Sequence, residues 1–177
     1  MTDQQIVERL RIVPDYPIKG IMFFDVTTLF KDAACFEELV NRICDYYRDK
    51  GITKVAGIES RGFIAGAAVA AKLGAAFVPI RKPGKLPART VSEKYSKEYG
   101  TDTIEIHADA ISPDDVVLIH DDILATGGTA SAAVRLVKGF DPKAVYCNFI
   151  INITDCPRTS PISEDVEVFS LLNLSEK

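Results

Sequence analysis

The sequence has no tryptophan, only two histidines, and no apolar run near the roughly 20 residues that a membrane-spanning helix needs. Its four cysteines include no Cys-x-x-Cys pair, which gives a zinc site little support. We expect reduced, partly buried thiols rather than a disulfide framework. Residues 1–5 hold neither a basic patch nor an apolar segment, so no signal peptide is predicted and the expected compartment is the cytoplasm.

A large excess of one sign of charge is also lacking, because the chain has 21 Lys and Arg residues and 25 Asp and Glu residues, for a net charge of −4. A protein that binds nucleic acid through its phosphates needs a basic face, which this balance disfavours. A local basic patch is still able to bind a small polyanion. We therefore expect small-molecule ligands, and neither nucleic acid nor a membrane as a partner.

Short apolar runs alternate with helical patterns through most of the chain. Strands that are apolar on both faces and separated by helices are typical of a parallel sheet covered on both sides. The apolar runs lie at 54–58, 75–80, 116–119 and 144–153, with helical patterns at 62–73 and 129–140. We also expect helices over 3–13 and 32–50, a short strand at 21–23, and an edge strand at 166–172. The sequence predicts an α/β protein with a single domain over residues 1–177.

Residues 81–103 interrupt this alternation with a polar segment rich in charge, proline and glycine. Residues 91–95 of this segment are predicted to pair with 103–107, at its end, as a long hairpin. A polar excursion of this length in a compact domain is typical of a lid or a binding loop, and a solvated surface hairpin is the alternative.

Three of the predicted strands run directly into charged loops. They are Glu59-Ser60-Arg61-Gly62, Arg81-Lys82-Pro83-Gly84-Lys85 and His120-Asp121-Asp122. Ligands of open parallel sheets bind beyond the carboxyl ends of the strands. The cations of the first two loops would there face the carboxylates of the third, an arrangement suited to a substrate with phosphates and hydroxyls.

A glycine-rich turn, Thr126-Gly127-Gly128-Thr129, follows the acid pair and precedes a helix. Adjacent glycines let successive N–H groups point at one spot, and the helix dipole adds to an anion site. A plain strand-to-helix turn remains the alternative. The Asp121-Asp122 carboxylates are able to accept hydrogen bonds from vicinal sugar hydroxyls, unless they form a solvated strand end. Residues 57–62 have P-loop glycine spacing but lack the Lys-Ser/Thr that must follow, and the dinucleotide motif Gly-x-Gly-x-x-Gly is absent from the sequence.

An apolar strand followed by Asp121-Asp122-x-x-Ala125-Thr126-Gly127-Gly128-Thr129 resembles the signature of the type I phosphoribosyltransferases. Four further segments, in order, are similar to the adenine-specific branch of that family. They are Asp15-Tyr16-Pro17 through Gly20 and Asp25, residues 59–63, residues 81–87, and Glu98-Tyr99-Gly100. The resemblance implies a central, mostly parallel sheet flanked by helices, a small N-terminal hood over about 1–30, and a long flexible lid loop over about 81–103.

The resemblance also assigns roles to matching residues. Asp121 and Asp122 would hold the ribose hydroxyls of 5-phosphoribosyl 1-diphosphate. The 5-phosphate would lie against Ala125, Thr126, Gly127, Gly128 and Thr129. Pyrophosphate would be bound by Ser60, Arg61, Arg81 and Lys85, with a cis peptide bond before Ser60. Mg²⁺ would be carried by the substrate rather than by protein ligands, and a homodimer is the family habit.

The implied reaction transfers the phosphoribosyl group to N9 of adenine, giving AMP and pyrophosphate. Its catalytic residues would be Glu98, as acid or base near the purine, and Arg61, although Glu98 is equally able to pair with a nearby lysine. The base would contact Met22, Phe24 and Ile123, with Phe24 standing where the branch often has a basic residue. The same reaction on hypoxanthine, guanine or xanthine, and a regulator that binds the sugar diphosphate without chemistry, remain alternatives.

His120 also departs from the family pattern, because an apolar residue is commoner there. We predict a polar strand end for it, in preference to a partner for Asp121.

Overall fold

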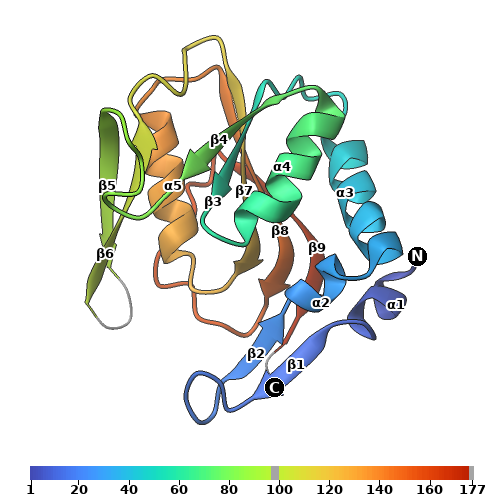
Figure 1. Cartoon of the computed structure of the whole chain (residues 1–177). Helices are drawn as coiled ribbons and strands as arrows, with labels where there is room; N and C mark the ends of the chain where they lie inside the picture. Colours follow the sequence, from blue (N-terminus) through green and yellow to red (C-terminus); the bar gives the residue numbers. More distant parts are fainter. Residues whose placement is uncertain (97–99, 176–177) are drawn as a thin grey trace.

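The computed structural model describes residues 1–96 and 100–175 of the chain, and its centre is a parallel five-stranded sheet (Figure 1). The strand order is β4-β3-β7-β8-β9, and every neighbouring pair is parallel. The strands are β3 (Lys54–Ile58), β4 (Ala76–Ile80), β7 (Val116–Leu124), β8 (Ala144–Ile153) and β9 (Glu167–Leu174). The predicted α/β architecture with a mostly parallel sheet is confirmed.

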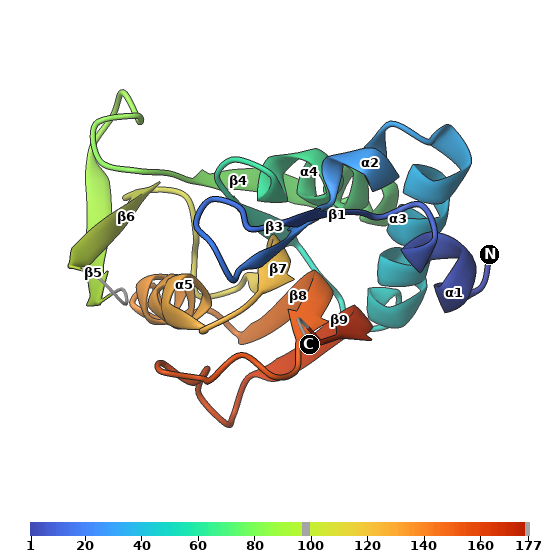
Figure 2. The same cartoon turned by 90° about the horizontal axis from the view of Figure 1, so that it is seen from below.

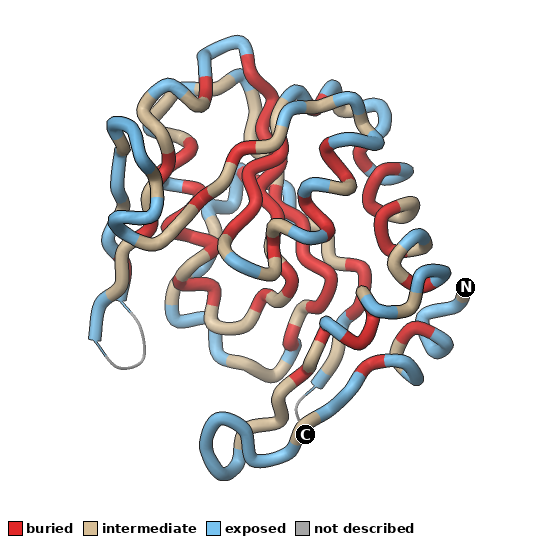
Figure 3. Tube along the Cα trace, in the orientation of Figure 1, coloured by how far each residue is buried: buried red, intermediate tan, exposed pale blue. Residues whose placement is uncertain are grey.

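Helices cover the two faces of this sheet (Figures 1 and 2). The first face packs on α3 (Ala33–Tyr47) and α4 (Gly62–Leu73), and the second on α5 (Gly128–Lys138). Alternate residues of β7 enter the two cores, Leu118 on the α3 and α4 side and Ile119 on the α5 side. Figure 3 shows the buried residues concentrated along these central strands, which is why their sequences are apolar throughout.

The N-terminal hood differs from the expectation of one helix over 3–13. It consists of α1 (Asp3–Val7), β1 (Arg11–Pro14), β2 (Met22–Asp25) and α2 (Thr27–Phe30), and β1 pairs antiparallel with β2. Ile6 and Leu10 are buried as the helical spacing required. Beyond them, the β-branched Ile12 and Val13 favour a strand, and Pro14 disfavours helical backbone in the residue before it.

The segment predicted as a hairpin forms β5 (Thr90–Ser96) and β6 (Thr101–His107), paired from Thr90↔His107 to Ser96↔Thr101. Its inner side is part of the core on the α5 face, where Tyr95, Ile104 and Ile106 are buried. Glu93 also forms an ion pair with Arg135 of α5 at 2.7 Å. The stem of the predicted lid loop is therefore packed on the main body.

Asp115 joins the beginnings of β3 and β7. It accepts hydrogen bonds from Thr53 Oγ1 at 2.8 Å and from Ser112 N at 2.7 Å, and pairs with Lys54 at 3.1 Å. Burial opposes its ionisation, but these bonds outweigh burial and lower the pKa of Asp115 to about 2. The carboxylate therefore stabilises the fold at neutral pH.

We expect Asp115→Asn to lower the free energy of unfolding by about 2 kcal/mol at pH 7, as measured by urea denaturation. Because the folded-state pKa is lowered, this contribution is complete above about pH 4 and is lost as the pH falls from about 4 toward 2. The difference between the wild type and the variant should shrink over that interval. The exposed neighbour Asp114 supplies the control variant Asp114→Asn, which should change stability little. A difference that is constant from pH 7 to pH 3 would contradict this assignment.

Candidate functional site

The acid pair lies inside a strand and not after its end as predicted. β7 stays paired with β8 as far as Leu124↔Asn152, five residues beyond the predicted end at residue 119. Asp122 is only 3% exposed and forms an ion pair and a hydrogen bond with Arg61. The backbone N–H of Asp122 donates to Asp121 Oδ1 at 2.9 Å. The two carboxyls are thus fixed at the carboxyl edge of the sheet.

Burial and neighbouring charges shift the pKa values of Asp121 and Arg61. Burial, followed by the charge of Asp122, raises the pKa of Asp121 well above its ordinary value. Burial opposes the charge of Arg61, but Asp122 and Asp121 outweigh it and raise the pKa of Arg61. The site therefore holds a permanent cation, Arg61, paired with Asp122, and next to them a carboxyl group, Asp121, with an increased affinity for a proton.

The turn from β3 to α4 carries Ser60 and Arg61, and its Glu59–Ser60 peptide bond is cis, as the resemblance implied. A Cβ atom added at Gly62 would lie 2.7 Å from the carbonyl oxygen of His120 and 3.1 Å from Asp121 Oδ1. Only a glycine lets the turn approach β7 this closely. This approach brings the Arg61 guanidinium to Asp122 and places it 5.8 Å from the centre of the Phe23 ring.

The phosphate turn, residues 125–129, leads from β7 into α5. Gly127 has a φ of 87°, and a Cβ added there would lie 2.4 Å from the Ser160 carbonyl oxygen. Among the described residues, no side chain caps the N-terminus of α5, and the residues of its first turn line a cavity of about 110 Å³. That cavity is lined by Asp121, residues 123–130 and Phe149. Its size and its donors suit a phosphate group.

A second cavity, of about 280 Å³, lies between the hood and the acid pair. Its lining is Ile21, Met22, Phe23, Phe24, Arg61, Asp121, Asp122, Ile123, Ala125 and Ile153. The structure thus brings together the predicted base-contacting residues Met22, Phe24 and Ile123. Asp121, Ile123 and Ala125 line both cavities, so the phosphate turn, the acid pair and the hood cavity are continuous. Sequence reasoning did not identify Phe23 or Ile153, although Phe23 belongs to the predicted apolar strand.

Arg81 and Lys85 follow β4, and Arg81 lies beside Glu59 of the turn between β3 and α4. Arg81 Nε is 3.3 Å from Glu59 Oε1, and Arg81 Nη1 donates to the Lys85 carbonyl oxygen at 3.3 Å. Lys82 N donates to the same Glu59 carboxylate. In the described part of the chain, neither Arg81 nor Lys85 lines either of the two cavities. Of the four predicted pyrophosphate-binding residues, Arg61 lines the cavity at the acid pair, whereas Ser60, Arg81 and Lys85 line neither cavity.

His120 is fully buried, so the predicted polar strand end is wrong. Its Nδ1 lies 2.8 Å from Asn148 Oδ1, and Asn148 Nδ2 donates to the Phe169 carbonyl oxygen at 3.0 Å. The Asn148 amide is thereby oriented so that His120 Nδ1 carries the proton. Burial lowers the pKa of His120 to about 4, which keeps the ring neutral. Sequence reasoning did not identify Asn148, because the contact joins neighbouring strands.

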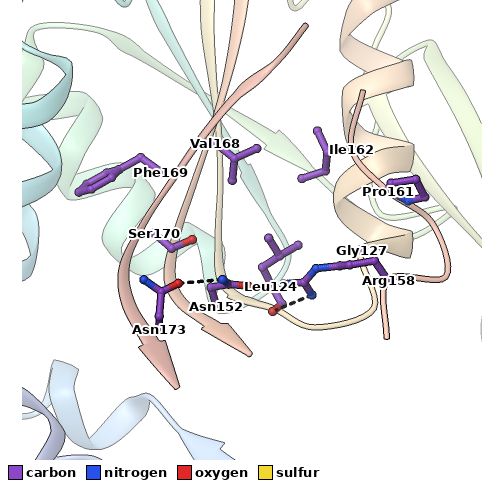
Figure 4. Close-up of a pocket in the computed structure, with 10 residues that line it drawn as sticks. All are labelled: Leu124, Gly127, Asn152, Arg158, Pro161, Ile162, Val168, Phe169, Ser170 and Asn173. Carbon is purple, nitrogen blue, oxygen red and sulfur yellow. Dashed lines mark hydrogen bonds between the residues drawn. The ribbon is translucent and has the colours of Figure 1, made fainter. Parts of the chain in front are cut away.

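A separate cavity of about 630 Å³ lies behind the phosphate turn, between β9 and α5 (Figure 4). Its lining includes Val168, Ile162, Arg158 and Gly127. Arg158 donates to the carbonyl oxygens of Leu124 and Ile153, each at 3.3 Å. These hydrogen bonds hold the segment after β8, which contains Arg158, against the end of β7 that precedes the phosphate turn. This cavity was not predicted, because its residues are far apart in the sequence.

Glu98, the predicted acid or base, lies outside the described residues. Among residues 1–96 and 100–175, no three His, Cys, Asp or Glu side chains gather closely enough to hold a metal ion. In the same ranges no helix has the length and apolar character to cross a membrane.

Comparison with known proteins agrees with this geometry. Residues 30–172 match the family model described as the phosphoribosyl transferase domain. The chain is 58% identical over 174 residues to an adenine phosphoribosyltransferase of Bacteroides thetaiotaomicron, covering 98% of this chain and 99% of the relative.

Solved structures give the same result. The adenine phosphoribosyltransferase of Rhodothermus marinus is 45% identical with a TM-score of 0.90, and 97% of each chain is covered. The enzyme of Giardia lamblia in complex with 9-deazaadenine is 36% identical with a TM-score of 0.92, and 98% of each chain is covered. The chain therefore belongs to the phosphoribosyl transferase domain family and, within it, to the group of the adenine phosphoribosyltransferases.

Proposed function

We propose that this protein transfers the phosphoribosyl group of 5-phosphoribosyl 1-diphosphate to adenine, giving AMP and pyrophosphate. The observation that carries this proposal is the continuity of the phosphate turn, the acid pair and the hood cavity along one edge of the sheet. The similarity to the Giardia lamblia structure, whose ligand is 9-deazaadenine, supports adenine as the base.

The substrates follow from the order of the three parts. The 5-phosphate occupies the cavity at the N-terminus of α5, and the ribose hydroxyls bind Asp121 and Asp122. Adenine then occupies the hood cavity against Ile123 and the backbone of Met22 and Phe24. In this placement C1 of the ribose faces Arg61, which lies beside both the acid pair and the hood cavity.

In the reaction, the bond from C1 to the diphosphate oxygen breaks and a bond from C1 to N9 of adenine forms. Ser60 and Arg61 bind the leaving diphosphate and stabilise the charge that develops on it. The Asp122 carboxylate exchanges part of its contact with Arg61 for a ribose hydroxyl, which frees the guanidinium for the diphosphate. On the basis of the family resemblance, we propose that Glu98 accepts the proton that N9 loses.

Mg²⁺ fits this site as a companion of the substrate. The ion prefers hard oxygen ligands and usually retains waters while it bridges phosphates. Asp122 is engaged by Arg61, so the acid pair alone supplies too few free carboxylate oxygens for a protein-held ion. The diphosphate and the ribose hydroxyls would supply the remaining ligands, and the bound ion would offset the charge of the leaving group.

We further propose a cytoplasmic homodimer of single-domain subunits, with the hood over about 1–30 and the lid over about 81–103. Support for the dimer comes from the family resemblance, which assigns Arg81 and Lys85 to the diphosphate. In a dimer these cations would reach the diphosphate across the subunit interface.

The direct test of this function is to mix the protein with Mg²⁺, 5-phosphoribosyl 1-diphosphate and one purine base at a time, and to measure nucleotide and pyrophosphate. We expect AMP and pyrophosphate in equal amounts with adenine. Product with guanine, hypoxanthine or xanthine but not with adenine would retain the family and reject the base. Absence of product with every base would favour the regulator, which binds the sugar diphosphate without chemistry.

The ribose assignment is tested by the double variant Asp121→Asn/Asp122→Asn. Hydrogen bonds to a charged acceptor contribute about 1.5–3 kcal/mol each, so we expect binding of the sugar diphosphate to weaken at least about tenfold. Calorimetric titration measures this affinity, with Asp114→Asn as the control. Unchanged affinity in the double variant would reject the assignment.

A further inference from the structure

The hairpin meets the phosphate turn at a junction formed by Lys82, Tyr95, Asp102 and Thr129. Thr129 Oγ1 donates to the Tyr95 hydroxyl oxygen at 3.2 Å, and Lys82 Nζ donates to the same oxygen at 3.4 Å. The Tyr95 hydroxyl in turn donates to Asp102 Oδ2 at 3.3 Å. Lys82 and Asp102 also form an ion pair. Tyr95 thereby links a hairpin residue and a residue of the phosphate turn.

Close packing fixes this junction. Tyr95 is only 6% exposed, and the Lys82 ammonium lies 5.8 Å from the centre of its ring. A Cβ added at Gly128 would lie 3.3 Å from the Ser96 carbonyl oxygen and 3.5 Å from Tyr95 Cδ2. The end of β5 therefore rests directly on the turn that leads into α5.

The hydrogen bonds of the junction are long compared with the 2.7–2.8 Å typical of hydroxyl pairs, so they are easily exchanged. A threonine hydroxyl can donate only one hydrogen bond, and in this structure Thr129 donates it to the Tyr95 hydroxyl oxygen. If a bound phosphate accepts the hydrogen bond of Thr129 instead, the Tyr95 hydroxyl is able to rotate away from Asp102 and donate a hydrogen bond to Thr129 Oγ1. Lys82 remains as the partner of Asp102. The result is a chain from Tyr95 through Thr129 to the phosphate, whose members strengthen one another.

We propose that Tyr95 is a positioning residue for the phosphate turn, which orients the Thr129 hydroxyl and donates to it when a phosphate group is bound. This inference rests on the proposed function, because it takes the 5-phosphate of the substrate as the ligand of the turn. It couples the occupancy of the turn to the position of β5.

The test is a double-mutant cycle of Tyr95→Phe and Thr129→Val, read by calorimetric binding of ribose 5-phosphate and by steady-state kinetics. Tyr95→Phe keeps the packed ring and removes only the hydroxyl. We expect it to weaken ribose 5-phosphate binding and to raise the KM for the sugar diphosphate by about fivefold, the usual effect of one hydrogen bond. The KM for adenine and kcat should change less than about twofold.

The cycle separates positioning from a general structural effect. In the Thr129→Val background, Tyr95→Phe should cost nothing further, whereas in the Thr129→Ser background its full effect should return. Equal losses in all three backgrounds, or no loss in any of them, would overturn the inference. The matched control is Tyr46→Phe, which removes a surface hydroxyl bonded to Glu167 and should leave binding unchanged.

The two proposals fail in different ways. If the wild type binds ribose 5-phosphate with the expected cycle but forms no AMP, the proposed function is rejected and the role of Tyr95 stands. If AMP is formed but the cycle is additive, only the role of Tyr95 is rejected. If the wild type neither binds ribose 5-phosphate nor forms AMP, both are rejected.

Discussion

The site depends on the ion pair between Arg61 and Asp122 at the carboxyl edge of β3 and β7. Asp122 is almost fully buried, so without a cation its charge would be costly to retain. The parallel pairing of Gly57 with His120 brings the two strand ends side by side. Gly62 then lets the turn after β3 approach the backbone of β7. The cation, the acid pair and the hood cavity meet because of this single approach.

Neutral groups beneath the ion pair maintain its charge balance. His120 is uncharged at physiological pH and uses Nδ1 to bind Asn148, which is in turn bonded to the backbone of β9. A second buried cation here would compete with Arg61 for Asp122. Gly66 of α4 gives the imidazole its space, since a Cβ there would lie 3.3 Å from His120 Cδ2. Three strands and one helix thus support the acid pair without adding charge to it.

The central sheet was predictable because strands buried on both faces have to be apolar throughout, as at 54–58 and 144–153. The acid pair and the glycine-rich turn could be identified as candidate site elements because their residues are nearly consecutive in the sequence, and their roles stay predictions. Other features arise from contacts between distant residues, which a single sequence does not display. The hood strand at 11–14 is determined by its pairing with β2. The length of β7 is determined by its hydrogen-bonded pairing with β8. The burial of His120 depends on its contact with Asn148 of the neighbouring strand.

The continuity of the phosphate turn, the acid pair and the hood cavity is tested most directly by a crystal structure with ribose 5-phosphate and adenine bound together. We predict the phosphate against residues 125–129, the ribose hydroxyls on Asp121 and Asp122, and adenine in the hood cavity beside Ile123. A phosphate bound at Arg158 in the cavity behind the turn, or adenine outside the hood cavity, would contradict this account.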